Sequence, residues 1–317
     1  MSQTLTTLGD RMLGVVSSSR RFIRIGLGAL WVIDGALQLQ PAMFTPSFPV
    51  NVVGPALQSL PNPIYEYSLS ILQTYIIPHI SIWNTLFAFL QLLIGVLILS
   101  NRHTLRTLGL TLSLVWSGFL WVFAEGLGGI YASTMSGGVF PGTPSLLNGF
   151  PGAALLYAWL SILLLIPEHK WRLEGVFSPI RDGAAALFAV STLVQLSPLM
   201  WTAYGQASIF TANLDNLPPQ LWFTVEGIAH FSVSHPVTAN TLEVLAEGLA
   251  ALGVWGVTPK RWGYIYATIL LGFTWWFSLG LGGLLTGLGT DPNTPPLILL
   301  LMTPYILWCR QAQSNQT

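Results

Sequence analysis

Eight stretches of mostly apolar residues constrain the fold of this chain more than any other feature. Each approaches the roughly 20 residues that a helix needs to cross a bilayer. Segments 47–79 and 205–234 are amphipathic, aromatic and proline-containing, which is typical of helices that lie in the membrane interface. The sequence therefore predicts an all-α, polytopic membrane helical bundle with interfacial segments on its outer side. The eight expected transmembrane helices span residues 22–40, 80–100, 106–126, 149–167, 183–201, 236–258, 262–285 and 295–309.

The scarcity of charged residues indicates that lipid is the main solvent of this chain. Only 8% of its 317 residues are charged, whereas soluble domains carry about 25%. The net charge of zero argues against a nucleic-acid partner. A single cysteine, Cys309, allows no intrachain disulfide, so we expect no iron–sulfur cluster and no structural zinc site made by this chain alone.

The positions of the basic residues predict the orientation of the helices. If the N-terminus lies in the cytoplasm, all twelve Lys and Arg residues fall on that side of the membrane or at its edge, as the positive-inside rule requires. The opposite connections, near 41–79, 127–148, 202–235 and 286–294, contain none. We therefore expect both termini in the cytoplasm. The twelve are Arg11, Arg20, Arg21, Arg24, Arg102, Arg106, Lys170, Arg172, Arg181, Lys260, Arg261 and Arg310.

The two halves of the sequence resemble each other. Residues 38–45 (QLQPAMFT) align with 195–202 (QLSPLMWT), and residues 121–129 (WVFAEGLGG) align with 275–283 (WWFSLGLGG). Because each half holds an even number of spans, both halves enter the membrane with the same orientation. The pattern predicts two parallel four-helix repeats. The expected units are a cytoplasmic segment 1–21, a first module 22–168, a linker 169–182, a second module 183–309 and a tail 310–317.

Four acidic residues inside the expected spans are candidate catalytic or proton-carrying groups. Ionisable side chains are costly in a bilayer, so Asp34, Glu125, Glu243 and Glu247 are functional candidates by default. Glu243 and Glu247 are four residues apart and share one face of a helix, where two carboxylates resist ionising together. The alternative is that each acid is protonated or hydrogen-bonded to a neighbouring helix and only fixes packing.

The acids differ between the halves although the surrounding framework repeats. In the repeat register, Asp34 matches Ser191, Glu125 matches Leu279, and Glu247 matches Gln91. One asymmetric site built from both halves predicts such a pattern, and so does neutral drift.

Histidines and tryptophans on the outer side are candidate cofactor contacts. His79 and His235 are matched by the repeat, and each opens a helix. Imidazole can contact a metal, a haem or a quinone, and His79, His230 and His235 are the residues that could take part in a metal site. The alternative is a capping or interfacial role. Trp121 and Trp275 belong either to the aromatic belt of the membrane or to a pocket for a flat ring.

The sequence also resembles a known family of membrane proteins. The first helix carries Arg24, Gly26, Gly28, Trp31 and Gly35, and the outer His79 precedes a helix with Asn84 and Gly95. These features resemble the DoxX/DoxD-like integral membrane family, whose unit is a four-helix module, and this chain looks like two such modules fused. The family includes the small membrane subunit of thiosulfate:quinone oxidoreductase. The resemblance implies a quinone-linked redox role, a quinone as cofactor, and the plasma (inner) membrane of a prokaryote.

The outer face departs from what a thiosulfate site requires. It lacks Lys and Arg but carries acidic residues, which favours a neutral or cationic ligand or an accessory subunit that supplies positive charge. We expect a membrane subunit of a quinone-linked redox complex, with the lipid bilayer and other redox subunits as partners. The alternatives are a transporter or channel for a proton, a metal cation or a small neutral solute, and a non-catalytic assembly factor. The acids of this face are Glu66, Asp215, Glu226 and Asp291.

Overall fold

A computed structural model describes residues 2–130, 145–171, 176–256 and 260–313 of the chain. Every regular element in these residues is helical, so the expected all-α fold is confirmed for them. Three predicted features lie outside the described residues. They are the side chain of Cys309, the residue Arg172 and segment 131–144 of the outer connection.

Six described α-helices and several shorter helical turns form the first half of the chain. Long helices alternate with short ones, because Pro and Gly residues interrupt the apolar pattern at the membrane edges. The α-helices are α1 (Ser2–Leu37), α2 (Gly54–Leu57), α3 (Asn62–Ile71), α4 (Ile80–Leu99), α5 (His103–Phe123) and α7 (Ala153–Leu165), and the 3₁₀ turn η5 spans Gly126–Gly129.

The second half follows the same succession of long and short elements. Short helical segments again separate its first two long helices, as in the first half. The α-helices are α8 (Ser178–Gln195), α9 (Ala203–Gln206), α10 (Glu226–Ser234), α11 (Pro236–Trp255), α12 (Lys260–Phe273) and α13 (Thr294–Gln313), and the turn η14 spans Gly280–Gly283.

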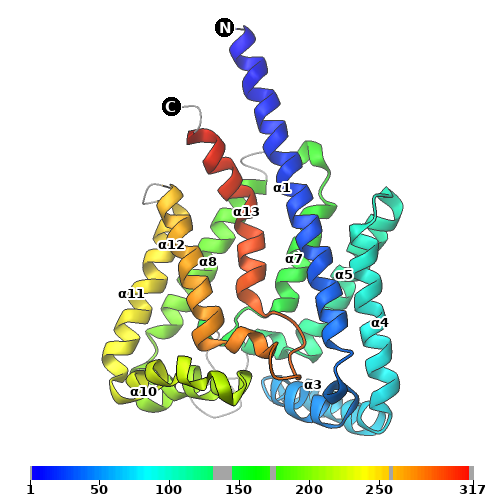
Figure 1. Ribbon diagram of the computed structural model, residues 1–317, viewed down its shortest axis with the longest axis vertical. Helices are drawn as coiled ribbons and strands as arrows, with labels where there is room; N and C mark the ends of the chain where they lie inside the picture. The colour runs from blue at the N-terminus through cyan, green and yellow to red at the C-terminus, as the bar shows by residue number, and fades with distance from the viewer. Residues whose placement is uncertain (1, 131–144, 172–175, 257–259, 314–317) are drawn as a thin grey trace.

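The long helices form one bundle with both termini at the same end (Figure 1). In this view α4 and α5 lie on the right, α11 and α12 lie on the left, and α1, α7, α8 and α13 lie between them. The short helices α3 and α10 run across the end opposite to the termini. This position agrees with the expectation that segments 47–79 and 205–234 do not cross the bundle.

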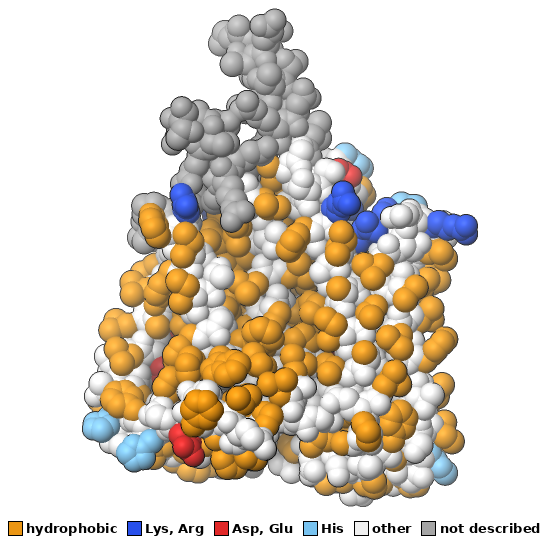
Figure 2. All heavy atoms as spheres, in the orientation of Figure 1, with side chains coloured by type: hydrophobic (Ala, Val, Ile, Leu, Met, Phe, Trp, Pro, Cys, Tyr) orange, Lys and Arg blue, Asp and Glu red, His pale blue; other side chains and the backbone are white. Residues whose placement is uncertain are grey.

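The surface has the polarity of a protein in a membrane. Three helical segments within the described residues are long and apolar enough to cross a bilayer, namely Asn62–Leu99, His103–Phe123 and Pro236–Trp255. Ala153–Leu165 and Thr294–Leu307 are shorter apolar helices. In Figure 2 hydrophobic side chains cover the middle of the molecule, and the Lys and Arg side chains that are drawn in blue gather at the end that carries the termini.

Helix bounds agree with the sequence in some places and differ in others, such as the expected segment 262–285, in which α12 ends at Phe273. The expected segment 80–100 corresponds to α4 (Ile80–Leu99), and 295–309 lies within α13 (Thr294–Gln313). The first helix, in contrast, begins at Ser2, well before the expected position 22. Polar residues in this first stretch end the apolar pattern without ending the helix, because apolarity reports the bilayer and not the helical backbone.

Close packing joins α1 to α4 in the first half. A Cβ atom on Gly95 would lie 2.7 Å from the Gly28 carbonyl oxygen, so only glycine allows the two backbones to approach this closely. Near the outer ends of the same helices, the Asn84 side chain donates a hydrogen bond of 2.6 Å to the Gln38 carbonyl oxygen. The framework that carries Asp34 is therefore held at both levels.

The second half repeats the asparagine contact. Asn240 on α11 donates a hydrogen bond of 2.8 Å to the Gln195 carbonyl oxygen at the end of α8, as Asn84 does to Gln38. The two Gly-Leu-Gly-Gly turns also match, because Leu127 and Leu281 have φ angles of 58° and 57°. Such values are rare for a residue with a side chain, so their recurrence reflects the same local fold.

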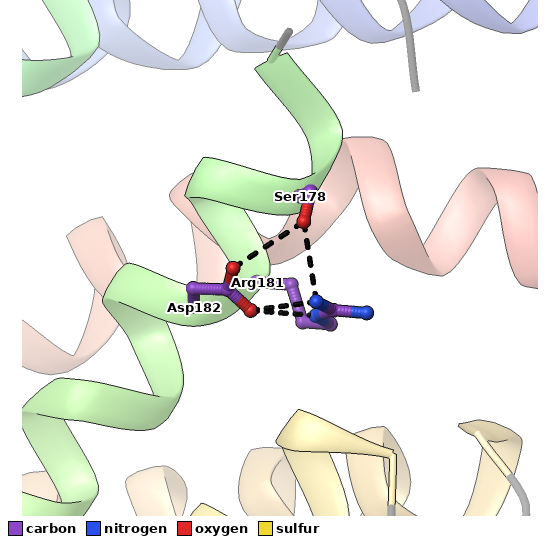
Figure 3. A network of polar contacts seen from close by, with 3 residues as sticks. All are labelled: Ser178, Arg181 and Asp182. Atoms are coloured by element: carbon purple, nitrogen blue, oxygen red, sulfur yellow. Dashed lines mark hydrogen bonds and ion pairs between the residues drawn. The ribbon is translucent and has the colours of Figure 1, made fainter. Parts of the chain in front are cut away.

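A polar network stabilises the start of α8 at the end of the bundle that carries the termini (Figure 3). The Arg181 Nε atom donates a hydrogen bond of 2.8 Å to Asp182 Oδ1, and the Ser178 hydroxyl donates one of 3.3 Å to Asp182 Oδ2. Arg24, the repeat-matched arginine, instead donates hydrogen bonds to the Leu99 and Ser100 carbonyl oxygens at the end of α4. Both arginines thus fix helix ends, each through different partners.

Candidate functional site

The first half encloses a largely apolar cavity of about 220 Å³. Its walls come from α1, α4, α5, α7 and the segment between α1 and α4, and Thr290 and Asp291 of the second half complete it. Two of the predicted site residues, Asp34 and Glu125, line it. The cavity carries no Lys, Arg or His side chain in its lining.

A row of aromatic side chains connects this cavity to the apolar side surface of the bundle. The Trp116 and Phe119 rings of α5 stack with centroids 5.1 Å apart, and Phe123 continues the row at 4.8 Å from Phe119. On the other side Phe87 of α4 lies 5.5 Å from Trp116. Because the Phe119 side chain is 45% exposed, the row extends from the cavity to the apolar surface.

The inner end of the cavity is closed by packed side chains. The Trp31 ring lies 4.4 Å from the Tyr157 ring, centroid to centroid. Its Nε1 atom donates a hydrogen bond of 2.8 Å to the Ser113 hydroxyl, which in turn contacts the Ser161 hydroxyl at 2.8 Å. Beyond Trp31 the core is apolar and includes the buried Leu27. Polar access to the cavity is therefore restricted to its other end.

Several buried polar atoms of the lining have no hydrogen-bond partner within the described residues. Asp34 is only 3% exposed, and its Oδ1 atom is one of them. The Tyr157 hydroxyl is close enough to influence this carboxyl group electrostatically. An unpartnered buried polar atom costs free energy, so a lining with several of them matches a ligand that has both donors and acceptors. The others are Gln38 Oε1, Ser68 Oγ, Gln91 Oε1, Trp116 Nε1 and the Tyr157 hydroxyl.

Glu125 lies where the cavity meets the start of α7. Both of its carboxylate oxygens accept hydrogen bonds from the Ala154 backbone N–H, at 3.0 and 3.1 Å. The partial positive charge at a helix N-terminus stabilises an anion in this position. The preceding Gly152 has a φ of 95°, and a Cβ atom there would collide with the Glu125 carboxylate. Glycine is therefore required for Glu125 to reach the helix end.

Asp291, which the sequence indicated only as an acid of the outer face, is a further functional candidate because it lines the apolar cavity. Its Oδ1 atom accepts a hydrogen bond of 2.7 Å from the Asn293 N–H, and its Oδ2 atom accepts one of 2.8 Å from the Thr290 hydroxyl. Burial raises the pKa of Asp291, and these two hydrogen bonds oppose that shift. One signal could have identified it. Asp291 precedes Pro292 at the start of the last helix, where the first half has Phe150 before Pro151.

A second cavity of about 460 Å³ lies beyond these two acids. It shares Glu125, Ala153 and Asp291 with the apolar cavity, and apart from Ala56 and Phe150 the rest of its lining is polar residues and glycine, so we call it the polar cavity. Asp34, Glu125 and Asp291 are close enough to repel one another electrostatically. The remaining polar residues of its lining are Ser59, Asn148, Ser208 and Asn293.

The other two predicted acids, Glu243 and Glu247, lie in α11, and neither lines either of these cavities. The Ser191 hydroxyl of α8 donates a hydrogen bond of 2.6 Å to Glu247 Oε1, and Glu247 is 2% exposed. Ser191 also accepts a hydrogen bond of 2.9 Å from the Leu146 N–H. Glu243 Oε2 accepts a hydrogen bond of 3.2 Å from the Gln206 side chain. These contacts tie both acids to neighbouring elements.

The predicted histidine and tryptophan contacts lie away from the cavity lining. His79 ends the 3₁₀ turn before α4, His230 lies in α10, and His235 stacks on Phe231 with ring centroids 5.2 Å apart. None of the three histidines lines either cavity. The residues described here also contain no group of three or more His, Cys, Asp or Glu that could hold a metal.

Trp121 and Trp275 make the same backbone contact in each half. The Trp121 indole donates a hydrogen bond of 2.9 Å to the Pro151 carbonyl oxygen, and Trp275 donates one of 2.7 Å to the Pro292 carbonyl oxygen. Each contact joins the third long helix to the start of the fourth. This repeated contact gives both tryptophans a structural role, and neither lines a cavity.

Comparison with known proteins identifies no relative on which a function could be based. The resemblance to the DoxX/DoxD-like family therefore stays a prediction from the sequence. No family model, no curated protein and no solved structure matches this chain.

Proposed function

We propose that this chain crosses the membrane eight times, as two like-oriented four-helix halves, with both termini in the cytoplasm. The eight expected segments each coincide with a helix or helical stretch, and both termini lie at one end of the bundle (Figure 1). Basic side chains gather at that same end, which the positive-inside rule assigns to the cytoplasm. The matched Asn84 and Asn240 contacts support a parallel repeat.

Within this frame the apolar cavity is proposed to bind the ring of a quinone, and the chain is proposed to be the membrane subunit of a quinone-linked redox complex. The observation that carries the proposal is a membrane-embedded, aromatic cavity in which buried polar atoms have no partner. A quinone carbonyl accepts a hydrogen bond, as from Trp116 Nε1. A quinol hydroxyl donates one, as to Gln38 Oε1 or Gln91 Oε1. The same lining can therefore serve both oxidation states.

Two further features fit a lipid-soluble ring. Phe119 connects the cavity to the apolar surface, so a ring with a hydrocarbon tail can enter from the bilayer. The lining lacks basic side chains, which disfavours an anionic substrate such as thiosulfate. Reduction of a quinone to a quinol takes up two electrons and two protons, so a redox partner that delivers the electrons is part of this proposal.

Quenching of tryptophan fluorescence by a short-chain quinone tests the proposal, because Trp31 and Trp116 line the cavity. We expect the quinone to quench the tryptophan fluorescence of the purified protein in a saturable way. Phe119→Ala removes a stacked ring and should weaken binding by roughly three- to tenfold.

The matched control is Phe273→Ala. Phe273 is 37% exposed and lies 4.6 Å from Phe277, much as Phe119 lies beside Phe123, but it lines neither cavity. Its substitution should leave the quenching curve unchanged. Quenching that does not saturate, or that falls equally in both variants, would contradict quinone binding in this cavity.

A second candidate function is transport of a proton or small cation. It is favoured by one observation, which is that carboxyl groups lie between two cavities. Proton flux through vesicles that contain the protein but no quinone would select this alternative over the redox role.

A further inference from the structure

The two cavities meet at a pair of acids that come from different halves of the chain. Glu125 follows α5 in the first half, and Asp291 precedes α13 in the second. Both line the apolar cavity and the polar cavity, whereas Asp34 lines only the apolar one. The acid pair therefore forms the boundary between the two cavities, and Asp34 lies on the side of the apolar cavity.

We infer that Glu125 and Asp291 form a proton route that connects the water at the outer face to Asp34. A proton from water in the polar cavity binds to one carboxylate of the pair. The resulting carboxylic acid then passes its proton to the Asp34 carboxylate, which returns the pair to its starting state. No other reactant is needed, and the charge of the chain is unchanged after Asp34 has released its proton to a bound ring.

The geometry explains why the route has this direction. The inner end of the apolar cavity is closed by the Trp31–Tyr157 contact and by the apolar core beyond it. The polar cavity, in contrast, is lined by hydroxyls and amides that can hydrogen-bond water, such as Ser59 and Asn148. Tyr157 is the other titratable group beside Asp34, and its hydroxyl lies within reach of that carboxyl.

Repulsion within the trio favours proton transfer. Because Asp34, Glu125 and Asp291 interact electrostatically, ionising all three together is unfavourable, which favours a state in which one of them is protonated. Hydrogen bonds hold each member of the outer pair in place, from the Ala154 N–H to Glu125 and from the Asn293 N–H to Asp291. The inference rests on the proposed quinone role for its purpose, since quinone reduction consumes protons, but not for its test.

Infrared spectroscopy of the protein in lipid can follow hydrogen–deuterium exchange at Asp34 directly. The Asp34→Asn variant assigns its carboxyl band. In the double variant Glu125→Gln with Asp291→Asn, exchange at Asp34 should slow by about tenfold or more, because the outer route then lacks groups that carry a proton. The Glu247 band, assigned with Glu247→Gln, is the internal control and should exchange at its original rate.

An unchanged exchange rate at Asp34 in this double variant would overturn the proton route. The measurement involves no quinone and no redox partner. Failure of quinone binding would therefore contradict the proposed function without affecting the test of the proton route. An unchanged exchange rate would likewise contradict the proton route without affecting the test of quinone binding. A circular dichroism spectrum that matches the unmodified protein shows that both variants are folded.

Thiol labelling tests the outer position of the polar cavity independently. In a Cys309→Ser background, Ser59→Cys should react with a charged, membrane-impermeant thiol reagent that is added from the outer side. The matched control, Ser68→Cys, lines the apolar cavity and should react only with a neutral, permeant reagent. Labelling of Ser59→Cys from the cytoplasmic side alone, or by the neutral reagent alone, would contradict an outer aqueous route.

Discussion

The two halves of this protein share a framework but differ in how they place a carboxyl group inside it. In the first half the acid is Asp34 on α1, and Gln91 on α4 is buried without a partner for its Oε1 atom. In the second half the corresponding positions are reversed in character, with Ser191 on α8 and Glu247 on α11. There the hydroxyl and the carboxylate are joined at 2.6 Å.

At these matched positions the residues of the first half line a cavity, whereas those of the second half are joined by a hydrogen bond. Ser191 donates to Glu247 Oε1, although Glu247 Oε2 has no partner among the described residues. Asp34 and Gln91 each have an oxygen without a partner, and both line the apolar cavity. The position of Glu125 differs in the same sense, because the second half has the buried, apolar Leu279 there. A duplicated framework can thus keep its helix contacts while the polar residues at matched positions diverge.

Each half also reaches into the other. Ser145 and Leu146 belong to the outer connection of the first half, yet they contact Ser191 in the second. Conversely, Asp291 belongs to the second half and lines the cavity of the first, and Gln40 donates a hydrogen bond of 3.2 Å to the Gly289 carbonyl oxygen. The apolar cavity is therefore lined mainly by the first half, and the second half contributes one of its acids.

The largest difference between the halves should appear in stability. Ser191→Ala removes a hydroxyl that contacts Glu247, Ser145 and the Leu146 N–H, and it leaves buried polar groups without partners. We expect a loss of about 2–4 kcal/mol in the free energy of unfolding, measured in detergent micelles.

The control is the same truncation at the repeat-matched position of the first half. Asp34→Ala removes a carboxyl whose Oδ1 atom has no partner and whose side chain borders a cavity. It should change stability by less than about 1 kcal/mol, or raise it. Equal losses of unfolding free energy in the two variants would refute the contrast between a hydrogen-bonded Ser191 and a cavity-lining Asp34.

A transplant of the second-half pattern into the first half should abolish most of the quinone binding. In the double variant Asp34→Ser with Gln91→Glu, the introduced serine can donate to the introduced carboxylate, as Ser191 does to Glu247. The cavity then loses the acid on α1, and quinone affinity should fall by about ten- to a hundredfold in the fluorescence titration.

The reverse exchange in the second half, Ser191→Asp with Glu247→Gln, serves as its matched control. It disrupts the hydrogen bonds around Ser191 and should lower stability, but neither residue lines the cavity. Quinone affinity of the folded protein should therefore stay as it was. A loss of affinity in this second-half variant would show that the cavity is not the binding site.

The sequence was sufficient for the helices and for much of the register. Apolar length predicted segments such as 80–100, because burial in lipid and helix length are set by the same bilayer thickness. The alignment of the two repeats matches Ser191 with Asp34 and Gln91 with Glu247, so the sequence already contains the contrast between the halves. It did not contain the pairing of Ser191 with Glu247, because that depends on how α8 and α11 pack.

The cavity and its third acid lay beyond the sequence for a physical reason. A void is the difference between the spacing of helices and the volumes of side chains, and the periodicity of one chain does not report either at the required precision. Asp291 reaches the first half only because the outer connections cross between halves, which is a tertiary feature. The sequence predicted His79 and His235 as contacts from their matched positions, but matched positions also arise from shared helix starts.

The smallest expected effect concerns the acid that the second half contributes to the site. Burial raises the pKa of Asp291, so this carboxyl is ionised in the folded protein only at a cost. In the unfolded chain it ionises near its ordinary pKa of about 3.9. As the pH rises from below that value through the raised folded pKa, the unmodified protein should lose stability relative to Asp291→Asn, by up to about 1 kcal/mol. Thermal unfolding of both proteins across this pH range measures the difference, and Asp215→Asn, at an exposed acid of the same outer face, is the control that should show little change. If the advantage of Asp291→Asn shrank as the pH rose, Asp291 would be an acid that the fold prefers charged, and its place in a shared proton site with Glu125 would be untenable.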